Sequence, residues 1–73
     1  MFGVGTQIEK INSQPGHFHK DGARGRIVEI VRATGKYRGA ANAVVEDGYL
    51  VRWDGEPEQF APIFIPTHMV RKV

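Results

Sequence analysis

The stretch Gly48–Gly55, which reads GYLVRWDG, decides the fold of this 73-residue chain. Its residues alternate as in a pleated strand, so Tyr49, Val51 and Trp53 fall on one side and the side chains between them fall on the other. Glycines at both ends indicate turns. We therefore expect the central strand of a small antiparallel barrel. Tyr49, Val51 and Trp53 should lie in its core, because so short a chain must bury its few large side chains.

Four other stretches have the composition of β-strands, and turn-forming residues separate them. The expected strands are residues 4–11, 26–32, 59–65 and 70–73. Residues 12–23 and 33–43 are expected to be long loops, and 66–69 to be one 3₁₀ turn. The chain is therefore predicted to be all-β: a five-stranded SH3-like barrel with a short 3₁₀ turn before the last strand, in one domain over residues 1–73.

Several positions near the N-terminus have a specific expectation. Ile8 is expected inside the barrel and Lys10 outside, and Phe2 is expected to anchor the terminus. The apolar residues of 26–32 do not alternate strictly, which indicates either a bulge or apolar cover on both faces. Gly25 is placed to let the backbone bend there.

The composition is that of an ordinary globular domain, with 41% hydrophobic and 25% charged residues. The chain has no cysteine, which excludes disulfides and thiolate metal sites and fits a reducing compartment. Its formal net charge of +2 is well short of the basic stripe of a dedicated nucleic-acid binder. No apolar run is long enough to span a membrane, so we expect a cytoplasmic protein with no membrane partner. We also expect no cofactor.

Much of the predicted barrel resembles the plasmid-borne type II dihydrofolate reductases. The resemblance lies in residues 1–10, Gly25–Val28, Gly48–Val51 and 65–73. It implies a homotetramer with one central pore, in which a Gln-Ile-Tyr segment before a proline binds both ligands. This chain has Ile63-Phe64-Ile65 before Pro66 in place of that segment, and Lys10 matches a lysine at the mouth of the pore. A pore enzyme of this kind is one alternative for the function.

Two shorter resemblances agree on the barrel and differ on the function. The segment Asp21–Ile30, which reads DGARGRIVEI, is similar to the KOW motif of ribosomal and transcription-elongation proteins. It implies weak nucleic-acid binding through this turn. The segment Tyr49–Gly55 looks like small uncharacterised bacterial barrels with the same Tyr-Leu-Val-Arg-Trp-Asp run, which implies the fold and no chemistry.

Aromatic and basic residues interleave on and beside the two expected loops, and they are the candidate partner-binding residues. These candidates are Phe18, Lys20, Arg24, Tyr37 and Arg38. In SH3-like barrels such loops flank one groove, where ring faces can stack on a partner's side chains. In the competing interpretation, Phe18 folds back over the small core and the charges only solvate the loops. A nucleic-acid partner would instead have Lys20, Arg24, Arg26 and Arg38 on its phosphates.

The predicted strand 59–65 is apolar on both faces, although a small barrel has only one interior. Either Phe64 or the pair Ile63 and Ile65 must then face outward or meet another chain. We therefore name Ile63, Phe64 and Ile65 as a candidate oligomer interface. Cover by a loop is the alternative.

Catalytic and metal-binding patterns are weak. His17, His19 and Asp21 would project to the same side of an extended segment and could together hold zinc, with His68 as a conjectural fourth ligand. The neighbouring glycines and Lys20 favour a solvated loop tip instead. No serine has a recognisable catalytic partner. We therefore predict no catalytic and no metal site, and a non-catalytic protein-binding module that self-associates.

Overall fold

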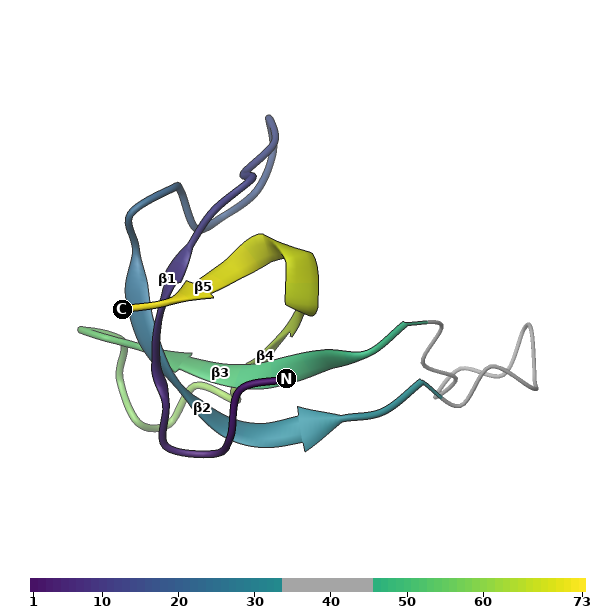
Figure 1. Ribbon diagram of the computed structural model, residues 1–73. Helices are drawn as coiled ribbons and strands as arrows, with labels where there is room; N and C mark the ends of the chain where they lie inside the picture. Colours follow the sequence, from purple (N-terminus) through teal and green to yellow (C-terminus); the bar gives the residue numbers. More distant parts are fainter. Residues whose placement is uncertain (34–45) are drawn as a thin grey trace, which may run out of the picture.

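The computed structural model describes residues 1–33 and 46–73, and in these the chain is all-β, as predicted (Figure 1). Its elements are β1 (Gln7–Lys10), β2 (Arg24–Val31), β3 (Gly48–Trp53), β4 (Ile63–Pro66), the 3₁₀ turn η1 (Thr67–Met69) and β5 (Val70–Lys72). The single 3₁₀ turn before the last strand is confirmed. The described residues form no helix long and apolar enough to cross a membrane.

Hydrogen bonds link the five strands into one antiparallel sheet in the order β4-β3-β2-β1-β5. The two edge strands are β4 and β5, yet only the three residues of η1 separate them in the chain. The sheet must therefore curl until its edges approach at η1, as Figure 1 shows. No pairing joins β4 to β5 in the described parts of the chain. The sheet is thus open, and the closed barrel expected from the sequence is not confirmed.

Two strands begin later than predicted because turns occupy their expected first residues. β1 begins at Gln7 rather than at residue 4, since Gly5 has a φ of 90° and leaves the extended conformation. β4 begins at Ile63 rather than at residue 59, since the Phe60 N–H donates to the Pro57 carbonyl in a turn, at 3.0 Å. Turn chemistry thus overrides strand composition at both places.

β2 contains a bulge, one of the two possibilities that its pattern allows. Its pairing with β3 shifts between Ile27 and Glu29, so Val28 is an extra residue in the ladder and is 37% exposed. The extra residue changes the phase of the strand. Ile27 and Ile30 therefore both contact the core although they are three residues apart.

Seven buried apolar side chains form the core: Ile8, Ile27, Tyr49, Val51, Trp53, Ile65 and Val70. The prediction for β3 is confirmed, because Tyr49, Val51 and Trp53 are 2%, 0% and 3% exposed. Phe2 anchors the N-terminus as predicted. Its ring stacks on that of Tyr49 at 6.1 Å, and its backbone N–H donates to the Tyr49 hydroxyl at 2.9 Å.

Lys10 is buried, and the prediction that it lies outside is wrong. Residues two apart on a strand share a face, and Ile8 and Lys10 are two apart on β1. With Ile8 in the core, the Lys10 side chain must also point inward. Its long aliphatic stem allows this, because the stem can pack among apolar groups while the nitrogen reaches polar ones.

We predict that Gly25→Ala destabilises the protein by about 1–3 kcal/mol, because the added methyl group overpacks the sheet. A Cβ at Gly25 would lie 2.8 Å from the Arg52 carbonyl oxygen and 2.9 Å from Val51 Cγ1. Gly3→Ala is the matched control, since nothing lies within 4 Å of its added Cβ. Urea unfolding measures both changes. Equal stability of the two variants would contradict the close packing of β2 on β3.

Candidate functional site

The loop between β1 and β2 is held in shape by its own hydrogen bonds. The Ser13 N–H donates to Asp21 Oδ1 at 2.8 Å, and the Ser13 hydroxyl donates to the His19 carbonyl at 3.2 Å. Asn12 Nδ2 donates to the His68 carbonyl at 2.7 Å, which ties this loop to η1. The loop between β1 and β2 is therefore attached to η1, which joins the two edge strands of the curled sheet.

Lys10 supplies the polar floor of this region. Its Nζ lies 3.1 Å from the Ile11 carbonyl, 2.9 Å from Ser13 Oγ and 3.5 Å from His17 Nδ1. An ammonium group has three N–H donors and no acceptor, and Ser13 Oγ and the Ile11 carbonyl accept two of them. His17 Nδ1 is the more distant third neighbour and also accepts the Gln14 N–H. None of these three groups is charged. Within residues 1–33 and 46–73, no carboxylate lies at ion-pair distance from Lys10.

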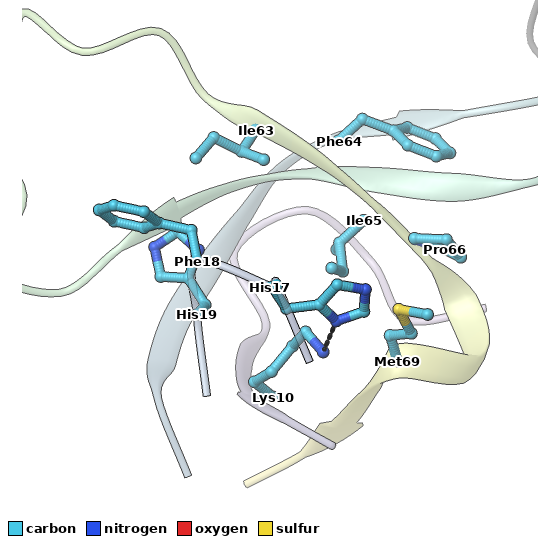
Figure 2. A pocket seen from close by; sticks show the side chains of 10 residues that line it. Lys10, His17, Phe18, His19, Ile63, Phe64, Ile65, Pro66 and Met69 are labelled. Atoms are coloured by element: carbon cyan, nitrogen blue, oxygen red, sulfur yellow. Dashed lines mark hydrogen bonds between the residues drawn. The ribbon is translucent and has the colours of Figure 1, made fainter. Parts of the chain in front are cut away.

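A hollow of about 380 Å³ opens between this loop and the strand β4 with η1 (Figure 2). Residues 16–19 line one side, and residues 63–66 together with Met69 line the other, with Lys10 at the floor. The walls are mainly apolar. Phe18 is 84% exposed, and Ile63 and Phe64 are 40% and 36% exposed, so large apolar side chains lie open to solvent around it.

His17 lies at the centre of the hollow with a defined tautomer. Figure 2 shows its ring between Lys10 and the side chains of Ile65, Pro66 and Met69. Nδ1 receives the Gln14 N–H at 3.1 Å and faces the Lys10 ammonium, which can only donate. Nδ1 must therefore be the nitrogen without a proton, and Nε2 has the proton. The Nε2–H lies on the side of the ring away from Lys10, and no described residue accepts it.

A stack of rings supports the rim of the hollow. The His19 ring packs against the Trp53 indole at 4.3 Å, and Phe18 packs edge-on against His19 at 5.2 Å. His19 Nε2 also lies 3.5 Å from Glu56 Oε2, without an aligned hydrogen bond. Phe18 thus rests on a ring that the core itself supports, which limits the entropy that it loses when a partner covers it.

The structure places the predicted partner-binding residues in different locations. Phe18 is at the hollow, whereas Lys20 is exposed in the same loop outside its walls. Arg24 lies on β2 and forms an ion pair with Glu9 at 3.7 Å, away from the lining. Tyr37 and Arg38 lie outside the described residues. The competing interpretation, in which Phe18 folds back over the core, does not fit its exposure.

The predicted oligomer interface is divided by β4. Ile65 is a core residue and faces the interior, so it cannot contact another chain. Ile63 and Phe64 are both exposed and form the wall of the hollow. Phe64 is exposed and Ile65 is buried, as one of the two expected orientations requires, but Ile63 at the start of β4 is exposed as well.

The potential zinc ligands of the loop have separate partners. His17 Nδ1 faces Gln14 and Lys10, and Asp21 accepts the Ser13 N–H. His19 stacks on Trp53. In the part of the chain that the structure describes, no three His, Asp or Glu side chains are grouped closely enough to hold a metal ion.

We predict that Asp21 stabilises the loop above about pH 4 and loses this effect in acid. The Ser13 backbone N–H, with smaller contributions from the Ser13 side chain and the Lys10 charge, holds the pKa of the Asp21 carboxyl below its ordinary value of 3.8. A lowered pKa in the folded state means that the ionised form is stabilising. This stabilisation is full above the pKa of the unfolded chain and disappears as the pH falls through the folded value.

Thermal unfolding of the wild type and Asp21→Asn at neutral and acidic pH measures this effect. We expect the variant to melt lower at neutral pH and the difference to shrink as the pH falls below about 4. Glu58→Asn is a control at an exposed acidic position. A difference between the wild type and Asp21→Asn that stays constant with pH would contradict the role of Asp21.

Comparison of the chain with protein-family models, with curated proteins and with solved structures finds no match. The resemblances to known families therefore stay expectations. Sequence reasoning missed Lys10, His17 and Met69 as parts of one hollow. For Lys10 the signal was present in the two-residue period of β1. For Met69 it was not, because its position depends on how η1 crosses between the sheet edges.

Proposed function

We propose that this protein is a non-catalytic binding module and that its hollow receives an apolar segment of a partner protein. One observation supports this above all. Phe18, Ile63 and Phe64 leave large apolar side chains exposed around one concavity, and hydrogen bonds and ring stacking fix the loop on its one side. Apolar concave surfaces with a few placed polar groups are the usual sites of ligand and partner binding.

We also infer that the curled sheet belongs to the SH3-like barrels. The inference rests on five short antiparallel strands, on a long first loop and on the 3₁₀ turn that joins the two edges. In such barrels the groove beside the first long loop is the natural place for a peptide. The hollow lies next to the loop between β1 and β2 and is also lined by Met69 of η1, which supports this inference.

Nucleic-acid binding through the KOW-like segment has less support than protein binding, because two of its cations already have partners. Arg24 pairs with Glu9, and Arg26 Nη1 donates to the Gly5 carbonyl at 2.9 Å. A phosphate would have to compete with both partners.

The geometry of Ser13 does not support a catalytic role. The Ser13 hydroxyl donates to the His19 backbone carbonyl and not to His17, so it is not arranged as an activated nucleophile.

Self-association is the second candidate, since Ile63 and Phe64 lie exposed on the edge strand β4. Light scattering at several protein concentrations tests it. A dimer that disappears in Phe64→Ser would support contact through β4. A strict monomer at all concentrations would eliminate it and leave the hollow free for a different protein.

Selection from two displayed peptide libraries tests the main proposal. One library is attached through the peptide C-terminus and the other through the N-terminus, so that only the second has free C-terminal α-carboxylates. We expect at least one library to yield peptides with large apolar residues that no longer bind to Phe64→Ser. Failure of both libraries to enrich any such sequence would contradict the protein-binding function.

A further inference from the structure

The floor of the hollow has a buried positive charge that no acidic group contacts. Lys10 is 1% exposed, and its three acceptors are a carbonyl, a hydroxyl and an imidazole nitrogen. Asp21 interacts with it through Ser13 and through charge at a distance, forms no ion pair with it, and is itself exposed to solvent. Burial of a cation among neutral groups is costly, and it leaves a positive potential that an anion can neutralise.

His17 lies between the Lys10 ammonium and the hollow, so the positive charge acts on a ligand through its ring. Its Nδ1 faces the Lys10 ammonium, and its Nε2–H lies on the opposite side of the ring with no described acceptor. A cation behind Nδ1 withdraws electron density from the ring and so makes the Nε2–H a stronger donor. Hydrogen bonds strengthen one another when they form such a chain in a medium of low dielectric.

The hollow therefore combines one directed donor with apolar walls. None of the residues that line it in the described parts of the chain is acidic. An anionic group at the His17 Nε2–H would gain a charge-assisted hydrogen bond and the attraction of Lys10, both strengthened by the apolar surroundings. Ile63, Phe64 and Met69 could at the same time cover an apolar side chain.

We propose that the hollow binds the last residue of a partner protein, with its free α-carboxylate on His17 and its apolar side chain on β4. This inference deepens the proposed function and rests on it. A C-terminal residue has the carboxylate and the side chain on one carbon atom, so both reach a hollow of about 380 Å³ together. An internal aspartate or glutamate has no apolar group so close to its carboxylate. Capture of C-terminal carboxylates is an established mode of peptide recognition.

Two short peptides test the inference directly: acetyl-Gly-Gly-Leu with a free carboxylate, and the same peptide with a C-terminal amide. Their affinities are measured by ¹H–¹⁵N NMR titration of the wild-type protein. We expect the acid to bind at least about tenfold more tightly than the amide, because a hydrogen bond to a charged group is lost in the amide. Added salt should weaken the acid more than the amide.

Two lysine variants identify the source of the preference. Lys10→Met removes the buried charge with a side chain of similar length, and we expect the ratio of the two affinities to fall to about one. Lys20→Met removes an exposed lysine from the same loop and should leave the ratio unchanged. If Lys10→Met does not fold, the affinities of the acid and the amide for the wild-type protein still show whether the hollow prefers a C-terminal carboxylate.

Equal affinity of the acid and the amide would overturn the carboxylate inference. So would the absence of any shift at the amides of residues 16–19 and 63–69 with the acid at millimolar concentration. Either result is distinct from failure of the proposed function, because the peptides attached through the C-terminus have no free α-carboxylate. Enrichment from the library of these peptides alone would support the peptide-binding function and contradict the inference that the ligand is a C-terminal residue.

Discussion

Trp53→Ala should remove a large part of the stability of this protein, with an expected loss of about 3–5 kcal/mol. A domain of this length has a total free energy of unfolding of about 4–11 kcal/mol. Trp53 is 3% exposed at the end of β3, where it packs in the core and under the His19 ring. Its removal leaves a cavity and also withdraws the support of His19 and Phe18.

Urea unfolding followed by circular dichroism measures this loss, since Trp53 is the single tryptophan and its fluorescence is absent from the variant. Trp53→Phe keeps most of the buried area, and the indole Nε1 has no hydrogen-bond partner among the described residues, so its loss should be less than half as large. Phe60→Ala, at an aromatic residue that is 53% exposed, should change stability by about 0.5 kcal/mol or less. Similar losses in Phe60→Ala and Trp53→Ala would contradict the assignment of the core.

Phe18→Ser and Phe64→Ser should each weaken binding of a selected peptide by about 30-fold or more. Both residues line the hollow, and buried aromatic contacts dominate the binding energy of most interfaces. Phe18 is 84% exposed in the free protein, so its substitution should not change stability. Loss of binding without loss of stability would identify it as a contact residue.

Phe60→Ser is the matched control for these two variants, because Phe60 is an exposed aromatic residue outside the lining of the hollow. Isothermal calorimetry with the same peptide measures all three affinities, and circular dichroism shows whether each variant folds. Wild-type affinity in both Phe18→Ser and Phe64→Ser would place the binding site elsewhere.

The sheet was largely predictable because strand periodicity and turn chemistry act locally. The alternation of Tyr49, Val51 and Trp53 identified the core face of β3. The irregular apolar pattern of 26–32 indicated a bulge as one possibility, although it suggested a bend at Gly25 and the bulge lies at Val28. The start of β4 was not predictable from composition. There a turn at Pro57 competes with residues that otherwise favour a strand.

The hollow was predictable only in part, because it joins residues that are far apart in the sequence. Phe18 was named as a partner-binding candidate in a loop, and Phe64 as part of a candidate oligomer interface on a strand. Nothing in either stretch shows that they line the same concavity. Their proximity depends on the curl of the sheet and on the bond from Asn12 to the His68 carbonyl, which are tertiary features.

Lys10 shows how a residue-type preference can give the wrong prediction. Lysine is almost never fully buried, and this general preference favoured an outward side chain. The strand period and the position of Ile8 favoured an inward one, and the three acceptors of the loop provide for its charge. The polar groups of the loop that follows β1 therefore allow the Lys10 side chain to follow the strand period and point inward.

The most direct test of the binding-module proposal is where a selected peptide contacts the protein. Titration of ¹⁵N-labelled protein with the tightest peptide from the display selection gives this position residue by residue. We predict that the largest shifts occur at the amides of residues 16–19 and 63–69, around the hollow. Shifts concentrated instead around Glu9 and Arg71, on the exposed surface that β1 and β5 share, with the hollow unchanged, would contradict the proposal.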